Sequence, residues 1–182
     1  MTEQAAERCR KNRDFLEWMD AILLSVALIA LAFTFCARAV RVDGSSMVPT
    51  LHNGELLLTV SFGYTPERGD IVVVDSYIPH GRPLVKRVIG VAGDVIDIDF
   101  ANGIVTRNGD ILEEPYIAEL TTMYEGMDFP LTVPERTVFL MGDNRNHSKD
   151  SRDPEIGCVD VRDILGTPKL RISPFSAFGV LE

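Results

Sequence analysis

Hydrophobic side chains are arranged along the chain as one long run followed by many short ones. From Ala21 to Ala37, AILLSVALIALAFTFCA has no charged residue over 17 positions and lacks the polar face expected of a core helix. A tilted helix of this length lies at the lower end of what crosses about 30 Å of hydrocarbon. The run predicts a transmembrane anchor at 21–37, between a cytoplasmic segment, 1–20, and an extracytoplasmic domain, 38–182.

The orientation of the anchor follows from the basic residues around it. Four of them crowd into six positions ahead of the run, at Arg8, Arg10, Lys11 and Arg13. This bias predicts that the amino terminus stays in the cytoplasm. Alternatively, the run is a secretory signal cleaved at Ala37-Arg38-Ala39, which has the small-x-small form. The apolar stretch is longer than the usual 7–15 residues of such signals, which favours the anchor.

The short hydrophobic runs after residue 39 have the length and composition of β-strands. The expected strands are Leu56–Val60, Ile71–Val74, Leu84–Val91, Val95–Phe100, Ile104–Arg107, Thr137–Met141 and, weakly, Lys169–Ile172. No long helical period occurs there, apart from a possible single turn near Val161–Leu165. The fold class predicted for the second part of the chain is therefore all-β.

Turn signals separate these strands. Asn102-Gly103 and Asn108-Gly109 are typical of type I′ hairpins and bracket one short strand. Residues 118–132 read as a loop or an irregular hairpin.

Composition excludes several function classes. The net charge is −9 and the pI about 4.8, which disfavours a nucleic-acid binder. The three cysteines are too scattered for a disulfide framework or a zinc site, and Cys158 reads as a small buried hydrophobe. The sequence shows no metal-ligand spacing, phosphate loop or G-x-S-x-G elbow. We expect neither metal nor cofactor.

One candidate nucleophile stands in VDGSSMVPTL, residues 42–51. A Ser–His–Asp triad is conceivable, with Ser46, His147 and either Asp143 or Asp150, although a lone histidine in a loop is usually solvated. A serine can also be activated by a neutral lysine.

Lys86, within PLVKRVIGV, is the candidate for such a base. Burial among apolar groups would lower the pKa of its amine toward the working pH. Successive side chains of a strand alternate, so if Arg87 faces water, Lys86 faces inward with Leu84 and Val88. On composition alone, a lysine that extends its amine to water from a strand edge is an equal alternative.

A third block, MGDNRNHSKDSRDP at Met141–Pro154, follows an apolar strand directly. It is either a polar surface loop or a cluster that supports a site through Asp–Arg pairing.

Together these blocks resemble the type I signal peptidases, membrane-bound serine proteases with a Ser/Lys dyad. The matching segments, in family order, are GSSMVPTL, RGDIVVV, LVKRVIGVAGD, NGDILEEPYI and MGDNRNHSKDSRD. The resemblance implies coiled antiparallel sheets and the removal of signal peptides from exported preproteins after Ala-x-Ala-like sites. Partners would be signal peptides and the lipid bilayer, with the translocation machinery as a further candidate and no nucleic acid.

The resemblance also assigns residue roles. It makes Ser46 the nucleophile and Lys86 the general base, and leaves Ser45 and His147 without a role. The supporting residues it implies are Ser148, which orients the lysine, the pair Asp150 and Arg152, and the loop residues Asp143 and Asn144. About 56 residues separate Lys86 from the GDN block, so the accessory part is expected to be little more than a hairpin.

Gly44 departs from members that carry a serine there to complete the oxyanion hole, and matches the form typical of Gram-positive bacteria. The Ser46 N–H would be one oxyanion donor. The expected walls of the pockets for small side chains are Val42, Met47, Leu84 and Val85. Two rival functions are a self-cleaving regulatory Ser/Lys peptidase and an inactive membrane-anchored β-domain.

Overall fold

The computed structural model describes residues 3–75 and 83–181, with side chains inside the helix described at residues 13 and 15–31. The chain divides into two compact units, one ending at Ala37 and the other beginning at Arg38.

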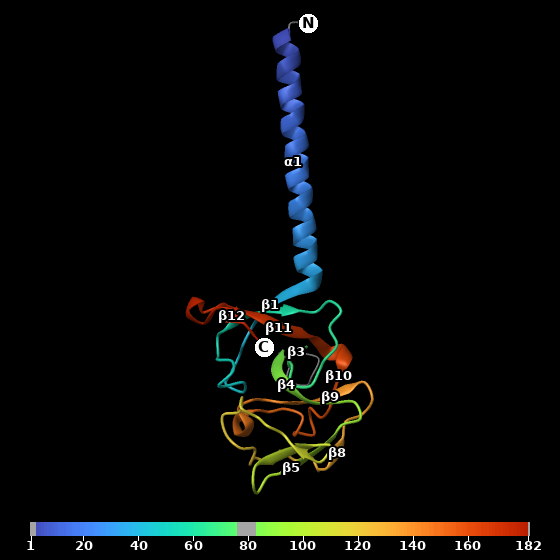
Figure 1. Ribbon diagram of the computed structural model, residues 1–182, viewed down its shortest axis with the longest axis vertical. Helices are drawn as coiled ribbons and strands as arrows, with labels where there is room; N and C mark the ends of the chain where they lie inside the picture. Colours follow the sequence, from blue (N-terminus) through green and yellow to red (C-terminus); the bar gives the residue numbers. More distant parts are fainter. Residues whose placement is uncertain (1–2, 76–82, 182) are drawn as a thin grey trace. The chain divides into compact units, whose positions relative to one another are not determined.

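The first unit is one helix, α1 (Glu3–Cys36), drawn in blue in Figure 1. It contains the predicted apolar run as far as Cys36. Of the residues described, none belongs to a helix that combines the length and apolarity needed to cross a membrane. The prediction of a span at 21–37 therefore rests on the sequence.

The second unit is built on a large antiparallel sheet with a short strand, β12, at its side. Its strands in spatial order are β1 (Ala37–Arg41), β2 (Leu56–Val60), β11 (Ile164–Ser173), β3 (Ile71–Val74), β4 (Leu84–Val91), β9 (Thr137–Met141) and β10 (Val159–Asp160), while β12 (Gly179–Val180) pairs with β11. The all-β prediction is confirmed. The weak strand expected at Lys169–Ile172 is part of the ten-residue β11.

Strand β4 lies inside this sheet, between β3 and β9 (Figure 1). Lys86 pairs with Val72 of β3, and Arg87 pairs with Met141 at the end of β9. This register brings the loop that follows Met141 next to the middle of β4. Apolar clusters cover both faces of the sheet here, one containing Val73 and Val85 and the other Val72 and Val88.

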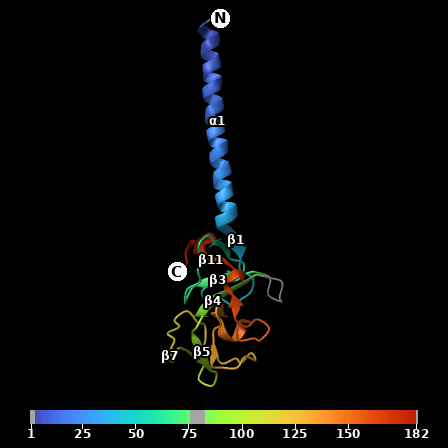
Figure 2. The same cartoon turned by 90° about the vertical axis from the view of Figure 1, so that its right-hand side faces the viewer.

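A smaller four-stranded sheet forms the other part of the unit, with β5 and β7 labelled in Figure 2. Its strands in spatial order are β7 (Asp110–Ile111), β6 (Ile104–Arg107), β5 (Val95–Asp99) and β8 (Leu131–Thr132). The accessory part is thus larger than the predicted hairpin. Ile96, Ile98 and Val105 pack in its core with Phe139 of β9.

The two Asn-Gly turns differ. Asn108 and Gly109 have φ values of 56° and 89°, as the predicted type I′ turn requires. At Asn102-Gly103 only the glycine has positive φ, 69°, so a type I′ turn is wrong there. Asp99 accounts for the difference, because its carboxylate accepts hydrogen bonds from the backbone N–H groups of Ala101 and Asn102 and shapes a longer loop.

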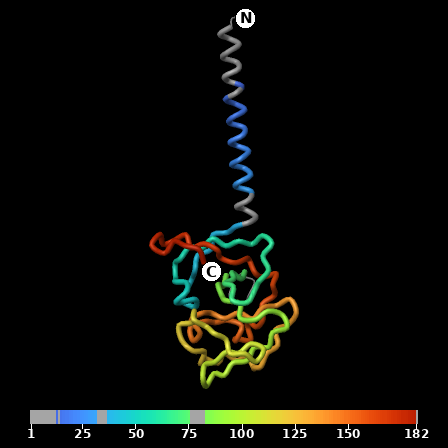
Figure 3. The backbone as a smooth tube through the Cα atoms, viewed as in Figure 1, coloured from blue at the N-terminus to red at the C-terminus, as the bar shows by residue number. Residues whose placement is uncertain are grey.

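Three short 3₁₀ helices complete the described elements: η1 (Arg145–His147), η2 (Val161–Asp163) and η3 (Phe175–Ala177). The turn expected near Val161–Leu165 is η2, which ends where β11 begins. Most of the segment between β7 and β9 has no regular structure, and Figure 3 follows it as the yellow part of the tube. Its contacts with the loop after β9 shape the candidate site.

Candidate active site

The segment Val42–Leu51 forms a tight turn over the large sheet. Gly44 adopts φ 95°, a conformation that glycine takes at little cost, and its N–H donates to Asn53 Oδ1 at 2.9 Å. Ser45 is exposed, whereas Ser46 is half-buried. The turn therefore directs Ser46, and not its neighbour, toward the protein.

Lys86 meets Ser46 at this point. Its Nζ lies 2.7 Å from Ser46 Oγ, within hydrogen-bond distance, and the residue is only 3% exposed. The structure thus has the inward orientation predicted for Lys86, and the alternative of an amine extended to water is wrong.

Burial also changes the acid–base chemistry of this amine. Desolvation lowers the pKa of Lys86 from 10.5 to about 8, against the opposing effect of nearby carboxylates, chiefly Asp150 and Glu125. A substantial fraction of Lys86 is therefore neutral near physiological pH, as proton abstraction from a serine requires.

Arg87 does not face water, so the condition from which the inward orientation of Lys86 was argued is not met. Arg87 is 6% exposed, and its guanidinium donates two hydrogen bonds to Asp143, of 2.8 and 2.7 Å. It also stacks on the ring of Tyr116, 4.0 Å from the centroid. The physical reason is that β4 is an interior strand whose two faces are both covered, so its charged side chain needs a buried partner.

Asp143 and Asn144 hold the turn that carries the serine. The Asn144 N–H donates to the Ser46 carbonyl at 2.9 Å, and Asn144 Nδ2 donates to the Ser45 carbonyl at 3.1 Å. Thr50 Oγ1, at the other side of the turn, donates to Asp143. The loop after β9 therefore fixes the backbone at the candidate nucleophile.

Ser148, Asp150 and Arg152 form a buried network beside the dyad. Arg152 Nε and Nη2 donate to the two oxygens of Asp150 at 2.8 and 2.9 Å, and Ser148 Oγ donates to Asp150 at 2.7 Å. The Gly142 N–H adds a bond of 2.9 Å to the same carboxylate. Asp150 thus orients the hydroxyl of Ser148, and the role in orienting the lysine that the resemblance implies for Ser148 stays a prediction.

The expected pocket walls lie in two different clusters. Val42, Met47 and Val85 are buried in one apolar cluster, whereas Leu84 is partly buried against the other. Residues 76–82, which precede β4 and its residues Leu84 and Val85, lie outside the described residues. The assignment of these four side chains to substrate pockets stays a prediction.

His147 is not in a triad with Ser46. Its imidazole is 70% exposed and lies 3.8 Å from Glu119. Its expected partners, Asp143 and Asp150, instead form ion pairs with Arg87 and Arg152. The geometry therefore favours the lysine as the base.

Several residues that support the site were assigned no role from the sequence. Arg145, fully buried, forms an ion pair of 2.6 Å with Glu114 and donates to Thr121 at 3.0 Å. Glu125 lies 3.0 Å from Arg152, in the segment predicted as a loop. Glu114 and Arg145 fall within the matching segments NGDILEEPYI and MGDNRNHSKDSRD, but no periodicity identifies Glu114 or Glu125 as a buried acid, because their partners are more than 25 residues away in the chain.

Known proteins resemble the chain over most of its length. Residues 15–173 match the family described as "Signal peptidase, peptidase S26". Signal peptidase I S of Bacillus subtilis (strain 168) is 37% identical over 182 residues, 94% of this chain and 96% of the relative. Signal peptidase I of Bacillus licheniformis is 36% identical over 186 residues, 97% of each chain. A solved signal peptidase I from Enterococcus faecalis V583 is 31% identical, with a TM-score of 0.48, and covers 57% of this chain and 97% of its own.

Proposed function

Because the chain belongs to the signal peptidase family, peptidase S26, we propose that it removes signal peptides from exported preproteins with Ser46 as nucleophile and Lys86 as general base. The geometry of the Ser46–Lys86 pair supports these two roles. A lysine that is 3% exposed, with a pKa lowered by burial to about 8, lies 2.7 Å from a serine hydroxyl. A buried amine next to an alcohol is what proton abstraction from that alcohol requires.

The reaction proceeds in two steps. Neutral Lys86 takes the proton of Ser46 as Oγ attacks the scissile carbonyl, and the resulting ammonium protonates the departing amine. Lys86 then takes a proton from the water that hydrolyses the acyl-enzyme, and returns it to Ser46 Oγ. The Ser46 N–H is one donor to the oxyanion, in a backbone that the two Asn144 hydrogen bonds hold in place.

The substrates are preproteins with small residues at the −1 and −3 positions. Signal peptides end in this small-x-small form, and shallow apolar pockets exclude larger side chains by volume. The support for Val42, Met47 and Val85 as pocket walls is that they pack together in one cluster near the turn of Ser46. Leu84 has weaker support, since it packs in another cluster.

The apolar run at 21–37 anchors the enzyme in the membrane, with residues 1–20 in the cytoplasm and the catalytic unit outside. The support is in the sequence: 17 positions without charge follow a cluster of basic residues. The run ends nine residues before Ser46 in the sequence. An amino-terminal tag should remain on the membrane-bound protein, and its loss there would indicate a cleaved signal.

Cleavage of a preprotein with an Ala-x-Ala site tests the assignment. The detergent-solubilised chain should process it, Ser46→Ala and Lys86→Met should not, and the matched control Ser45→Ala should keep most of the activity. Equal losses in Ser45→Ala and Ser46→Ala, or an active Lys86→Met, would contradict the dyad. A chain that cut only itself would be a regulatory peptidase, and one that cut nothing would be an inactive β-domain.

A further inference from the structure

Glu125 is a buried carboxylate next to the dyad's supporting network that the proposed reaction does not use. Its side chain is 8% exposed, and the backbone of Asp150 provides a hydrogen bond that favours its charged form. Its ion pair is to Arg152 Nη2, at 3.0 Å, and Arg152 already binds Asp150 through two hydrogen bonds. Burying an acid is costly, and the guanidinium that pairs with Glu125 is shared with Asp150, so this carboxylate requires an explanation.

The loop around Glu125 is fixed in place by the network itself. Arg152 Nη1 donates to the Met123 carbonyl at 3.3 Å, and the Met127 N–H donates to the Arg152 carbonyl at 3.0 Å. Asn146 Oδ1 accepts a further bond from the Met123 N–H, of 2.9 Å. Hydrogen bonds thus hold the chain on both sides of Glu125 against the segment that carries Ser148 and Asp150.

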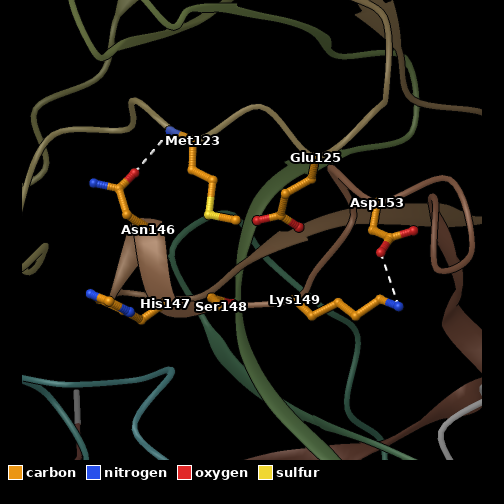
Figure 4. A pocket seen from close by; sticks show the side chains of 7 residues that line it. All are labelled: Met123, Glu125, Asn146, His147, Ser148, Lys149 and Asp153. Atoms are coloured by element: carbon orange, nitrogen blue, oxygen red, sulfur yellow. Dashed lines mark hydrogen bonds and ion pairs between the residues drawn. The ribbon is translucent and has the colours of Figure 1, made fainter.

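Figure 4 shows where this carboxylate points. Glu125 projects from the loop into a cavity of about 330 Å³, toward the segment 146–149 that forms the opposite wall. Ser148, whose hydroxyl binds Asp150, is part of that wall. A Cβ at Gly142 would lie 2.3 Å from Ser148 Oγ and 2.5 Å from the Ser46 carbonyl oxygen, and Ser46 Oγ lies 2.7 Å from Lys86 Nζ. The wall that Glu125 faces therefore adjoins the dyad. The other charged or titratable groups at the cavity are Asp153, Lys149 and His147, and Lys149 is paired with Asp153 at 3.0 Å and with Glu155 at 2.7 Å.

When each buried acid near the dyad is matched with one buried arginine, Glu125 and Lys86 are left without such a match. Asp143 is neutralised by Arg87, Glu114 by Arg145 and Asp150 by Arg152, in each case through an ion pair of 2.6–2.8 Å. Among the described buried groups around the dyad, the amine of Lys86 and the carboxylate of Glu125 are what remain. Together they carry one negative charge when Lys86 is neutral and none when it is an ammonium.

We propose that Glu125 is a positioning residue of the dyad, whose carboxylate stabilises the Lys86 ammonium that forms when the amine takes the proton of Ser46. The inference rests on the proposed function of Lys86. Glu125 exchanges no proton in this step: the proton passes from Ser46 Oγ to Lys86 Nζ while the bond from Oγ to the carbonyl carbon forms. The carboxylate acts through charge, across the buried side chains of Ser148 and Asp150, where charges interact more strongly than in bulk water.

The acid–base properties of the two groups are consistent with this role. Glu125 is among the groups that raise the pKa of Lys86 against the larger effect of burial. The pKa of Glu125 is itself raised to about 7, first by burial and then by the Asp150 charge, against the opposite effects of Arg152 and the Asp150 backbone. Glu125 is therefore ionised through most of the pH range in which Lys86 loses its proton.

The pH dependence of preprotein cleavage distinguishes this role from a purely structural one. In Glu125→Gln the acid-side midpoint should move to lower pH, by roughly one unit, because a nearby opposite charge is removed. The plateau rate should fall by up to about tenfold as the base weakens. Glu125→Asp keeps the charge and should stay near the wild-type midpoint, and the exposed control Glu135→Gln should change nothing. A variant that is slower at every pH with an unchanged midpoint would overturn the proposal.

A direct titration of Lys86 separates this proposal from the dyad assignment. The chain has only four lysines, so selectively labelled lysine side chains can be followed by NMR in detergent, with the Lys86 signal identified by its loss in Lys86→Met. On a Ser46→Ala background, adding Glu125→Gln should lower the Lys86 midpoint, and an unchanged midpoint would refute the action of Glu125. A midpoint that moved without a matching change in the rate profile would uphold that action and contradict Lys86 as the base.

Discussion

Gly142 lies where the two halves of the site meet, and replacing it with alanine tests how tightly they are packed. A Cβ at this position would lie 2.3 Å from Ser148 Oγ, 2.6 Å from Ser148 Cβ and 2.5 Å from the Ser46 carbonyl oxygen. Ordinary contacts begin at 3.4 Å, so the methyl group needs about 1 Å of additional space on two sides. A rotation of the Ser148 side chain cannot supply it, because the Ser46 oxygen belongs to the backbone.

The expected effect of Gly142→Ala is large on activity and moderate on stability. Moving the backbone of Ser46 by about 1 Å should reduce kcat/KM on the order of 100-fold, since catalytic groups tolerate little misplacement. Overpacking should lower the free energy of unfolding by about 1–3 kcal/mol. Preprotein cleavage under subsaturating conditions and chemical denaturation measure the two effects.

Gly179→Ala is the matched control for this substitution. Within the described residues, no atom lies within 4 Å of the position that a methyl group would take at Gly179, and its φ is not unusual. Both quantities should therefore stay near wild type. Wild-type cleavage by Gly142→Ala would refute the close approach of Ser148 and the Ser46 backbone.

The remaining predictions concern buried charges. Arg87→Met should lower the free energy of unfolding by about 3–5 kcal/mol, because it leaves Asp143 buried without its ion pair. The double variant Arg87→Met/Asp143→Leu should recover part of this loss. Equal stability of Arg87→Met and wild type in chemical denaturation would contradict the buried pair. Burial disfavours the charge of Asp94, but hydrogen bonds, first from Arg68, outweigh it and lower its pKa below 3.8. The stability that the Asp94 carboxylate contributes is therefore present above pH 3.8 and is lost as the pH falls through its lower pKa in the folded state. Asp94→Asn should lower the free energy of unfolding at pH 7 and lower it less in acid, whereas the exposed control Asp110→Asn should leave it unchanged. A loss that is independent of pH would argue against this linkage.

Much of the fold could be predicted from local sequence. Strands β2, β3, β4, β6 and β9 have the predicted bounds, because each is a short apolar run limited by glycine or polar turn residues. The two-residue strands β7, β8, β10 and β12 were not predicted, since two residues have no periodicity. The family resemblance, which rests on motifs in order along the chain, is confirmed.

The candidate site was less predictable than the fold. The approach of Lys86 to Ser46 was expected from the resemblance, whereas the burial of Arg87 was not, because alternation in a strand does not reveal that both faces are covered. Glu125 lies in an irregular loop and its importance depends on Arg152, 27 positions later in the chain. Charge balance of this kind is set by tertiary contacts, which a single sequence does not display.

The pH dependence of kcat/KM for preprotein cleavage tests the role of Lys86 most directly, because this ratio reports the ionisation of the free enzyme. We predict a rate that rises with pH as the amine loses its proton, with a midpoint of about 8, and an identical profile for His147→Ala. A midpoint near 6.5, roughly the ordinary value for histidine, that disappears in His147→Ala would contradict the lysine base.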